Sequence, residues 1–451
     1  NNPLNTSGMN NTLLVYAEKF SPRLDYTLNL IFSGILKVTF SITHNIREFE
    51  ESAEAKINYS PEKVKSGIRI NPCGLLFETG IHPIDIQISQ WKNHPCFFQT
   101  DQASDVPFDL FAASFFLASR YEEYLPFKTD QYGRFEAIQS LAFKYNFLQV
   151  PIVNQWVQEL ARLINNQYPS FVFPPLKFSF LPTFDIDDAY AYRHKGLLRT
   201  AGILAKAVLQ GNVKKFENCL KVLASRMPDP FDCYDYMLFF HKQYHLKPLL
   251  FFQVGRYGKY DKNISSTNKK FRQLIQKMDL QTETGLHPSF RSADHPELIV
   301  KEKAELEKIT GQKINRSRQH YLRLSLPDTY RNLIKAGIDK DFTMGYATQA
   351  GFRAGICSPF PFYDLQNEET TSLIIFPLVV MDITLKKYQD LNPLQADEAI
   401  KILIDKVKAV NGTFVSLWHN ETIVTEGPWR QVMEDMYKYI TRNNQYFIQK
   451  Q

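Results

Sequence analysis

The sequence has few cysteines, and they are not arranged to bind zinc or to form a disulfide framework. Of its 451 residues only five are cysteines, and no two of them form a CxxC pair. They lie far apart, at Cys73, Cys96, Cys219, Cys233 and Cys357. This spacing argues against a zinc ribbon or a disulfide-stapled fold and is typical of a reducing compartment. We therefore expect a cytoplasmic protein.

Long apolar runs and blocks of one charge are also missing. No apolar stretch approaches the length of a membrane span, and the apolar part of TLLVYAE near the start is too short for a secretion signal. The net charge is +6, with Lys and Arg interspersed among Asp and Glu, so we expect no nucleic-acid partner. The 44% hydrophobic and 14% aromatic content instead predicts packed globular cores.

The first 175 residues are predicted to form a smaller α/β accessory domain, because a chain of this length usually divides into domains. Ser21 followed by Pro22 is a typical helix start. The three prolines of YPSFVFPPLKF (168–178) mark the linker that follows. The expected strands are 12–18, 37–43 and 69–78, and the expected helices are 21–36, 105–125 and 153–167.

Residues 176–451 alternate short apolar strands with amphipathic helices, which indicates parallel strands joined by crossover helices. A TIM-like (β/α) barrel, with eight strands or fewer, closes such a sheet most economically. Ser325 and Asp328 are predicted to form a capping box for a helix that ends at Gly337. The expected strands include 177–184, 247–254, a short one ending at Gly285, 313–322, 341–347, 374–382 and 412–420.

The segment PTFDIDDAY (182–190) places three carboxylates directly after an apolar run. Crowded like charges repel one another unless a cation or solvent compensates them. Asp185 and Asp187 share one face of the strand, whereas Ile186 points the other way. One carboxylate could hold a divalent cation while the other takes a proton from water. The alternative is that these aspartates only cap a helix and turn the chain, a role that we assign to Asp188.

Other predicted strands also end in groups that can bind a metal or transfer a proton. His287 follows GL, Arg318 and His320 lie two residues apart and so on one strand face, and SLWHNE contains His419 and Glu421. In a barrel these strand ends meet at one mouth. Asp and His ligands favour zinc, with cobalt, manganese or iron as alternatives.

The segments PTFDIDDAY, ETGLHPSF, SRQHY and VSLWH resemble, in this order, the motifs of the polysaccharide deacetylase family (NodB-homology, carbohydrate esterase 4). The chain looks like a two-domain member of the Bacteroidetes kind. The resemblance implies a distorted (β/α) barrel over residues 176–451 with a partner domain before it. It also implies a metal-dependent carbohydrate deacetylase that hydrolyses a C–N amide bond.

Matched position by position, the resemblance implies a role for each residue. Asp185 corresponds to the general base, Asp187 and His287 to metal ligands, and His419 to the general acid. The two ends of the family's RxxY motif fall on Arg318, which orients the base, and Tyr321. Leu417 corresponds to the leucine that lines the acetyl pocket.

One position departs from the family's pattern. Arg291 stands where the family has its second metal histidine, and a guanidinium cannot bind a cation. Either another residue completes the site or metal binding is weakened or lost. His320 is the best substitute, and His295 and His194 are the alternatives.

Further residues are candidates for contacts with a sugar. Trp418 and the aromatic segment SPFPFYD (358–364) could stack on sugar rings or pack in the core. Arg353 stands between glycines and could contact an anionic sugar or a phosphate, or form an ordinary salt bridge. The segment YEEYL (121–125) is interpreted as a solvated helix end.

The function expected from these residues is metal-dependent removal of an acetyl or other acyl group from an N-acetylated sugar. A cytoplasmic location would favour a nucleotide-linked or lipid-linked precursor as the substrate. One alternative is a catalytically inactive glycan-binding or scaffold protein, which Arg291 makes credible. A less favoured one is a nucleotide-sugar glycosyltransferase that uses DID as a DxD pair.

Overall fold

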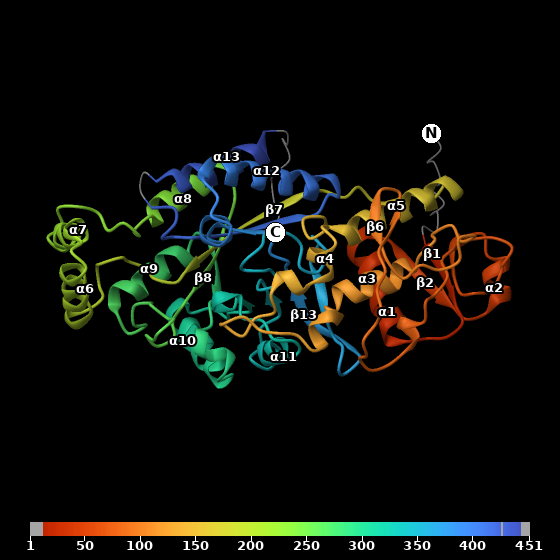
Figure 1. The fold of residues 1–451 in the computed structure, drawn as a ribbon, viewed down its shortest axis with the longest axis horizontal. Helices are drawn as coiled ribbons and strands as arrows, with labels where there is room; N and C mark the ends of the chain where they lie inside the picture. The colour runs from red at the N-terminus through yellow and green to blue at the C-terminus, as the bar shows by residue number, and fades with distance from the viewer. Residues whose placement is uncertain (1–11, 425–426, 443–451) are drawn as a thin grey trace, which may run out of the picture.

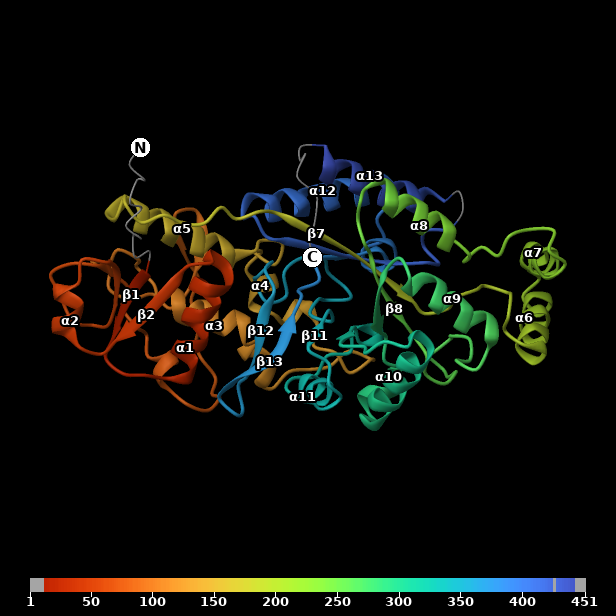
Figure 2. The ribbon, with the colours of Figure 1, turned by 180° about the vertical axis from the view of Figure 1, so that it is seen from behind.

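The molecule is elongated and carries its N-terminal segment at one end of the long axis. The computed structural model describes residues 12–424 and 427–442. Helices α6 (Leu197–Leu209) and α7 (Val213–Leu223) lie at the opposite end (Figure 1). Between the two ends, α12 (Pro393–Ala409) and α13 (Pro428–Thr441) run along one side, and α10 (Glu297–Thr310) and α11 (Asp328–Lys335) lie on the other (Figures 1 and 2).

The N-terminal segment contains a small sheet in the order β2-β1-β3-β4, in which every pair is parallel. Its chain begins with β1 (Thr12–Ala17), α1 (Pro22–Leu28), a π-helical extension (Asn29–Leu36), β2 (Thr39–Thr43), α2 (Ile46–Glu51), β3 (Ala55–Tyr59) and β4 (Ile68–Arg69). It continues with the hairpin β5 (Ser89–Trp91) and β6 (His94–Cys96), then α3 (Leu110–Ala118), α4 (Leu141–Lys144) and α5 (Ile152–Gln167). Short 3₁₀ turns cover Leu75–Phe77, Tyr121–Tyr124 and Ala137–Gln139.

The start of α1 was predicted correctly. The Ser21 hydroxyl accepts the Leu24 N–H at 3.0 Å, and Pro22 occupies the first helical turn, where its missing N–H costs nothing. The predicted strand at 69–78 is wrong. The strand β4 covers only Ile68–Arg69, and pairing ends with a single bridge from Ile70 to Val106, because Pro72 cannot donate to a ladder and Gly74 adopts φ 103°.

A nine-stranded sheet occupies the rest of the chain, in the order β12-β13-β11-β10-β9-β8-β7-β15-β14. All neighbours are parallel except the β12–β13 hairpin, so the α/β class is confirmed. Its strands are β7 (Ser179–Ile186), β8 (Leu249–Phe252), β9 (Glu283–Leu286), β10 (Arg316–Ser317), β11 (Lys340–Asp341), β12 (Phe360–Asp364), β13 (Glu369–Ile375), β14 (Val380–Met381) and β15 (Thr413–His419). This part of the chain also contains α8 (Tyr234–Gln243), α9 (Lys269–Asp279), a π-helical turn (Thr384–Tyr388) and 3₁₀ turns at Phe290–Ala293 and His320–Leu322.

A short piece of chain joins β13, the last parallel strand at one side of this sheet, to β14 at the opposite edge, since β13 ends at Ile375 and β14 begins at Val380. Within the connection, the Leu378 N–H donates to the Met344 carbonyl at 2.9 Å and the Val379 N–H to the Val415 carbonyl at 3.0 Å. The parallel strands therefore wrap around a shared interior instead of spreading flat. A fully closed barrel stays a prediction.

The N-terminal segment packs against the β12–β13 hairpin. The ring of Tyr363 on β12 lies 4.8 Å from Tyr26 and 5.2 Å from Phe115, centre to centre. The Tyr26 hydroxyl donates to the Pro361 carbonyl at 3.0 Å. The segment 358–364, expected as an aromatic loop, is thus mostly a buried strand in the core. The boundary near residue 175 stays a prediction, although the two larger sheets lie on either side of it.

Three local predictions are wrong. The strand expected over 313–322 ends at Ser317, and His320 begins a 3₁₀ turn, so Arg318 and His320 do not share a strand face. Ser325 does not cap α11, because Pro327 precedes the helix and makes no side-chain capping bond. YEEYL is not solvated: Tyr121 is 0% exposed and Glu123 4%.

Candidate active site

The candidate residues lie where parallel strands end. Asp185 is the second-to-last residue of β7 and Asp187 directly follows the strand, while His287 directly follows β9. His419 ends β15 and pairs in register with Asp185 of β7. Because the carboxyl ends of parallel strands meet at one rim, these groups converge from separate parts of the sequence.

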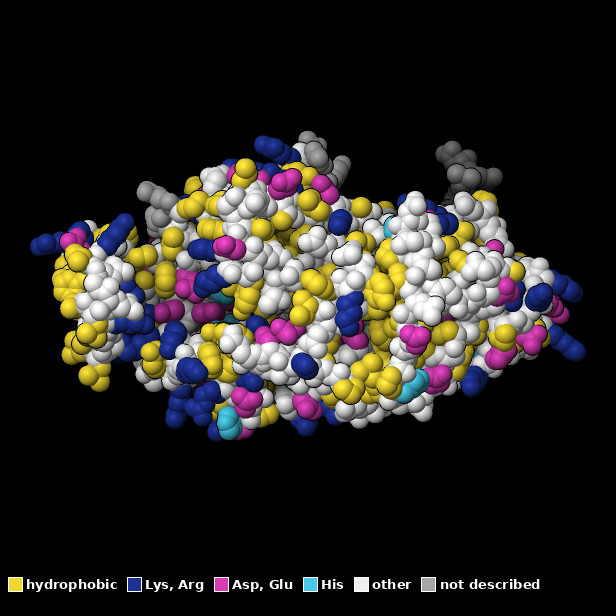
Figure 3. All heavy atoms as spheres, viewed as in Figure 1, with side chains coloured by type: hydrophobic (Ala, Val, Ile, Leu, Met, Phe, Trp, Pro, Cys, Tyr) yellow, Lys and Arg dark blue, Asp and Glu magenta, His cyan; other side chains and the backbone are white. Residues whose placement is uncertain are grey.

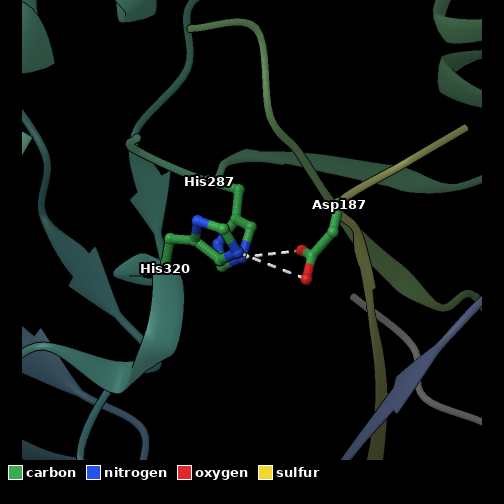
Figure 4. A group of neighbouring side chains, drawn as sticks. All are labelled: Asp187, His287 and His320. Atoms are coloured by element: carbon green, nitrogen blue, oxygen red, sulfur yellow. Dashed lines mark ion pairs between the residues drawn. The ribbon is translucent and has the colours of Figure 1, made fainter. Parts of the chain in front are cut away.

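Asp187, His287 and His320 form the group best suited to hold a cation (Figure 4). Nε2 of His287 lies 3.1 Å from Oδ1 of Asp187, and Nε2 of His320 lies 3.3 Å from Oδ2. One donor atom from each residue falls within 4.8 Å of the others. His320 thus joins His287 and Asp187, although its 3₁₀ turn, and not a strand, brings it there.

The hydrogen bonds on the far side of each imidazole determine what faces Asp187. Nδ1 of His287 lies 2.6 Å from the Arg318 carbonyl oxygen, and Nδ1 of His320 lies 2.9 Å from Oδ1 of Asp261. The Gln253 amide nitrogen, which donates to the same Asp261 oxygen at 2.8 Å, also lies 2.8 Å from Nδ1 of His320. The Arg318 carbonyl and the Asp261 carboxylate are acceptors, so each Nδ1 donates its proton to them. In the neutral ring the Nε2 lone pair then points at the Asp187 carboxylate, an arrangement that needs a cation or a proton between them.

The spacing also fits a tetrahedral ion. Zinc binds nitrogen and carboxylate oxygen at about 2.0–2.2 Å, which separates two tetrahedral ligands by about 3.3–3.5 Å. The two nitrogen–oxygen distances of 3.1 and 3.3 Å are close to this value. Oδ1 of Asp187 is buried and has no hydrogen-bond partner, which suits an atom that binds a cation. The residues present therefore fit a divalent cation.

The charges of the group are strongly coupled. Burial disfavours the charged form of Asp187, but His320 and His287 together hold the pKa of this carboxyl well below its usual value. Burial likewise opposes the charge on His320, yet Asp187 and Asp261 raise the pKa of its imidazole to about 9. Two carboxylates thus favour positive charge at this point, whether a proton or a metal ion supplies it.

Asp185 is fixed by a buried arginine. Nη1 of Arg318 donates to Oδ1 of Asp185 at 2.9 Å, while Nη2 donates to the Thr183 hydroxyl at 2.7 Å and Nε to the Phe342 carbonyl at 3.0 Å. The arginine side chain is 0% exposed. Oδ2 of Asp185 is left facing the candidate cation site, 3.6 Å from Nε2 of His287.

His419, on the strand next to Asp185, is held by Asp382. Nδ1 of His419 lies 2.8 Å from Oδ1 of Asp382, and the backbone N–H of His419 donates to Oδ2 at 2.8 Å. Burial lowers the pKa of the imidazole, but Asp382 and Asp187 outweigh this and raise it to about 10. Nε2 lies 3.8 Å from Oδ2 of Asp187 and so faces the same site.

These groups open into a cavity of about 600 Å³. Figure 3 shows it as a hollow with acidic side chains inside, beside the end that carries α6 and α7. Leu417 and Tyr321, both predicted from the sequence to contact substrate, line it. The other lining residues include the apolar Ala347, Met381 and Ile383, the charged Lys262, Lys387 and Glu421, and the aromatic Tyr132, Tyr260 and Tyr388.

Part of the wall comes from the N-terminal segment. Tyr132 lies 5.0 Å from the Tyr321 ring, centre to centre, and its carbonyl accepts from Nε of Arg323 at 2.9 Å. Arg134 is 6% exposed, pairs with Asp130 and donates to the Tyr321 carbonyl at 2.8 Å. No local sequence pattern marks this loop, because its position depends on packing between distant segments.

Two predicted substrate contacts lie elsewhere. Trp418 is 1% exposed and belongs to the hydrophobic core, because alternation along β15 turns it away from Leu417 and His419. Arg353 is 2% exposed and binds the Glu123 carboxylate through Nε at 2.9 Å and Nη2 at 2.5 Å. Neither side chain lines the cavity, so their assignment as substrate contacts is corrected.

Of the three histidines that could replace the missing metal ligand at position 291, only His320 lies at the candidate cation site. Arg291 itself is exposed, in the 3₁₀ turn Phe290–Ala293. The side chain of His295 is 54% exposed and pairs with Glu297, and His194 lines a different cavity. Asp188 is not the helix cap we expected, since it forms an ion pair with Lys195.

Asp382 and Asp261, which orient His419 and His320, were missed. Asp382 follows β14, and the rule used for Asp187 would have found it, because it ends the apolar run IIFPLVVMD. Asp261 lies in the irregular chain after β8, where no pattern distinguishes it.

A protein-family model described as a family of unknown function (DUF7033) matches residues 13–169, the N-terminal segment. Comparison with curated proteins gives no match. In the part of the chain that the structure describes, no helix is long and apolar enough to cross a membrane.

Solved structures similar to this chain include deacetylases. A protein of Mycobacterium smegmatis, provisionally named a polysaccharide deacetylase, has 11% identity and a TM-score of 0.41, covering 60% of this chain and 86% of its own. The polysaccharide deacetylase Bc1974 of Bacillus cereus has 12% identity and a TM-score of 0.28, covering 59% and 88%. A carbohydrate esterase 4 pseudoenzyme of Bacillus anthracis, BA3943, has 11% identity and a TM-score of 0.29, covering 60% and 62%. Because these scores are below 0.5, the argument for function rests on the side chains.

Proposed function

We propose that this protein is a metal-dependent hydrolase that removes an acetyl or other acyl group from an N-acetylated sugar or glycan precursor. The observation that carries the proposal is the arrangement around Asp187. A carboxylate fixed by Arg318 and an imidazole fixed by Asp382 face one three-donor cation site. Hydrolysis of an amide needs this combination of a base, an acid and an electrophile.

Asp187, His287 and His320 would hold the cation, with zinc favoured by the nitrogen-rich donor set and cobalt or manganese as alternatives. When bound, the ion would polarise the amide carbonyl and lower the pKa of a water molecule. Asp261 and the Arg318 carbonyl would orient the two imidazoles so that Nε2 of each faces the ion.

Asp185 would act as the general base. Its Oδ1 is occupied by Arg318, whereas Oδ2 faces the site and can accept the proton of the attacking water. The water oxygen forms a bond to the carbonyl carbon as this proton leaves. The three hydrogen bonds of the Arg318 guanidinium keep the carboxylate from rotating away.

His419 would act as the general acid. Asp382 favours the protonated imidazole, so Nε2 can deliver a proton to the amide nitrogen as the C–N bond breaks. The products are a carboxylate and a free amine. Leu417, Met381 and Ala347 form an apolar part of the cavity that suits the acyl methyl group, and the tyrosines suit a sugar ring.

The proposal is tested by measuring metal content and acetate release together. Wild type and Asp187→Ala are purified without chelator and their metal content is measured by elemental mass spectrometry. Acetate release is then assayed with N-acetylglucosamine, its oligomers and nucleotide-linked N-acetyl sugars, for wild type, Asp185→Asn and His419→Ala.

Metal bound to wild type but not to Asp187→Ala, with turnover that both other variants lose, is the expected result. Metal binding without turnover on any N-acetylated sugar would refute the deacetylase assignment but keep the metal site. A wild-type chain that takes up no zinc, cobalt or manganese would refute both, and the glycan-binding alternative would then lead.

A further inference from the structure

The end of the molecule formed by α6 and α7 is unusually apolar at its surface. Twenty large hydrophobic side chains are exposed in the described part of the chain, and seven of them lie within residues 197–223. They are Leu197 at 90%, Leu198 at 90%, Val208 at 63%, Leu209 at 87%, Val213 at 66%, Leu220 at 44% and Leu223 at 41%. Exposed apolar groups scattered singly are normal, but a concentration of this kind marks an interaction surface.

The exposed residues of α6 share one face. At 100° per residue, Leu197, Leu198, Ala201, Ala205, Val208 and Leu209 fall within an arc of about 120°. Arg199 and Lys206 lie beside this arc, and the buried Ala207 lies on the side turned to the protein. Apolar side chains bordered by cations are typical of helices that lie in the plane of a membrane interface.

The charge of the region points to an anionic partner. Residues 193–226 contain eight Lys and Arg and one Glu, a net charge of +7, whereas the whole chain carries +6. Figure 3 shows Lys and Arg at the rim of the yellow surface at this end. The rest of the molecule is therefore close to neutral, and the positive charge is concentrated where the apolar side chains are exposed.

A second, cationic cavity lies at the base of these helices. It has a volume of about 490 Å³ and its lining contains no Asp or Glu. His194, Lys195, Arg199 and Arg256 line it together with the Ser265–Asn268 segment. Lys195 pairs with Asp188 of the catalytic cavity, so the two cavities are neighbours. Lys195 is thus neutralised by Asp188, and Arg199 donates to the Asn263 and Lys262 carbonyls, so Arg256 and the hydroxyls of Ser265, Ser266 and Thr267 are the groups that suit a phosphate headgroup.

We propose that the α6–α7 hairpin docks the protein on a membrane surface that contains anionic lipid. The leucines and valines enter the boundary between headgroups and acyl chains, and the cations around them bind lipid phosphates. The hairpin lies on the surface and does not span the bilayer. This interaction does not depend on the chemistry proposed for the catalytic cavity.

The test is co-sedimentation of the full chain with sucrose-loaded vesicles of phosphatidylcholine, with or without phosphatidylglycerol. We expect binding only with phosphatidylglycerol, and we expect high salt to weaken it. Lys206→Gln/Lys214→Gln/Lys221→Gln should weaken partitioning by about 100-fold at low salt, since each basic residue near the surface contributes about fivefold.

The apolar contribution is tested with Leu197→Ser/Leu198→Ser/Leu209→Ser, which should weaken partitioning by at least about tenfold. The matched control is Leu280→Ser/Leu394→Ser, which removes leucines that are 84% and 79% exposed elsewhere. All of these side chains are exposed, so the variants should unfold at the wild-type temperature. The control should bind vesicles as wild type does.

A tryptophan at Leu198 reports insertion directly. The four native tryptophans are all buried, at 7% exposure or less, and should not respond to lipid. Emission of Leu198→Trp should shift to the blue only when anionic vesicles are added. Wild type that stays in solution with anionic vesicles, or a serine variant that binds as wild type does, would overturn the proposal. The proposal would also be overturned if sedimentation velocity without lipid showed a dimer of wild type and of the control variant, but a monomer of Leu197→Ser/Leu198→Ser/Leu209→Ser.

Discussion

Nε2 of His320 lies 3.3 Å from Oδ2 of Asp187, in the position that a metal ligand would take. The 3₁₀ turn that carries it places Tyr321 at φ 61° and Leu322 at φ 51°, in the left-handed region that residues with side chains rarely adopt. Such strain is retained where a site requires it. The turn thus supplies the third donor that the residue at 291 does not.

We expect His320→Ala to lower zinc affinity by at least about 100-fold, because one of the three protein ligands is lost and only Asp187 and His287 remain. Titration calorimetry on the chelator-treated chain measures this. Arg291→His is the matched control and should leave the affinity unchanged, since this side chain is exposed. A large gain in affinity for Arg291→His would instead show that the turn Phe290–Ala293 folds into the site.

Asp382→Asn should lower kcat for acyl hydrolysis by about 100-fold. The asparagine can still accept the backbone N–H of His419, but it no longer favours a positive charge on the imidazole. Initial rates at saturating substrate measure the loss. If Asp382 acts through His419, the double variant with His419→Ala will be no slower than His419→Ala alone, and an additive loss would contradict this role.

The strand-end residues could be predicted from the sequence because their signal is local. Asp185, Asp187 and His419 follow or end apolar runs whose period fixes the face that each side chain takes. The same periodicity should have placed Trp418 in the core, since it alternates with Leu417. An aromatic residue between two site residues was a poor guide to substrate contact.

The rest of the site depends on contacts between distant segments. His320 is positioned by a strained turn, and Asp382 by a strand of only two residues. Tyr132 enters the cavity because the N-terminal segment packs on the β12–β13 hairpin. None of these arrangements leaves a periodic pattern. The salt-bridge alternative for Arg353 could not be chosen from the sequence for a related reason, because its partner Glu123 is distant in the sequence.

Arg318→Lys should reduce kcat while leaving the metal content unchanged. A lysine retains the charge but cannot make the three hydrogen bonds of the buried guanidinium to Asp185, Thr183 and Phe342. Unsatisfied partners should lower the free energy of unfolding by about 1–3 kcal/mol. Rates, elemental analysis and urea denaturation separate these effects. Loss of metal along with activity would contradict the assignment of Arg318 to Asp185 alone.

Tyr132→Ala should raise KM for a sugar substrate and leave kcat within a few-fold of wild type. The ring lines the cavity but makes no contact with Asp185 or His419 in the described structure. Phe127→Ala, which removes another aromatic ring of the same segment that lies outside the cavity lining, is the control. Steady-state kinetics measure both, and an unchanged KM would mean that the N-terminal segment does not touch the substrate.

Glu123→Gln should destabilise the protein by about 3–5 kcal/mol at neutral pH, because it leaves the buried Arg353 guanidinium without a carboxylate and the buried Arg120 with Glu122 alone. Glu123 accepts from Arg353 at 2.5 and 2.9 Å and from Nε of Arg120 at 2.7 Å. Urea denaturation at pH 7 measures the loss. Glu51→Gln, at an exposed position, should change the free energy of unfolding little.

The same pair of variants gives a prediction for pH. Burial alone would raise the pKa of Glu123, but Arg353 and Arg120 hold it below the ordinary value of 4.5. A carboxyl with a lower pKa in the folded state contributes stability above its unfolded pKa and loses it as the pH falls through the folded value. The difference in free energy of unfolding between wild type and Glu123→Gln should therefore be constant at a pH above 4.5, the ordinary pKa of a glutamate, and should shrink as the pH falls below it. A difference that stays the same in acid would mean that packing, and not the charge of Glu123, stabilises this network.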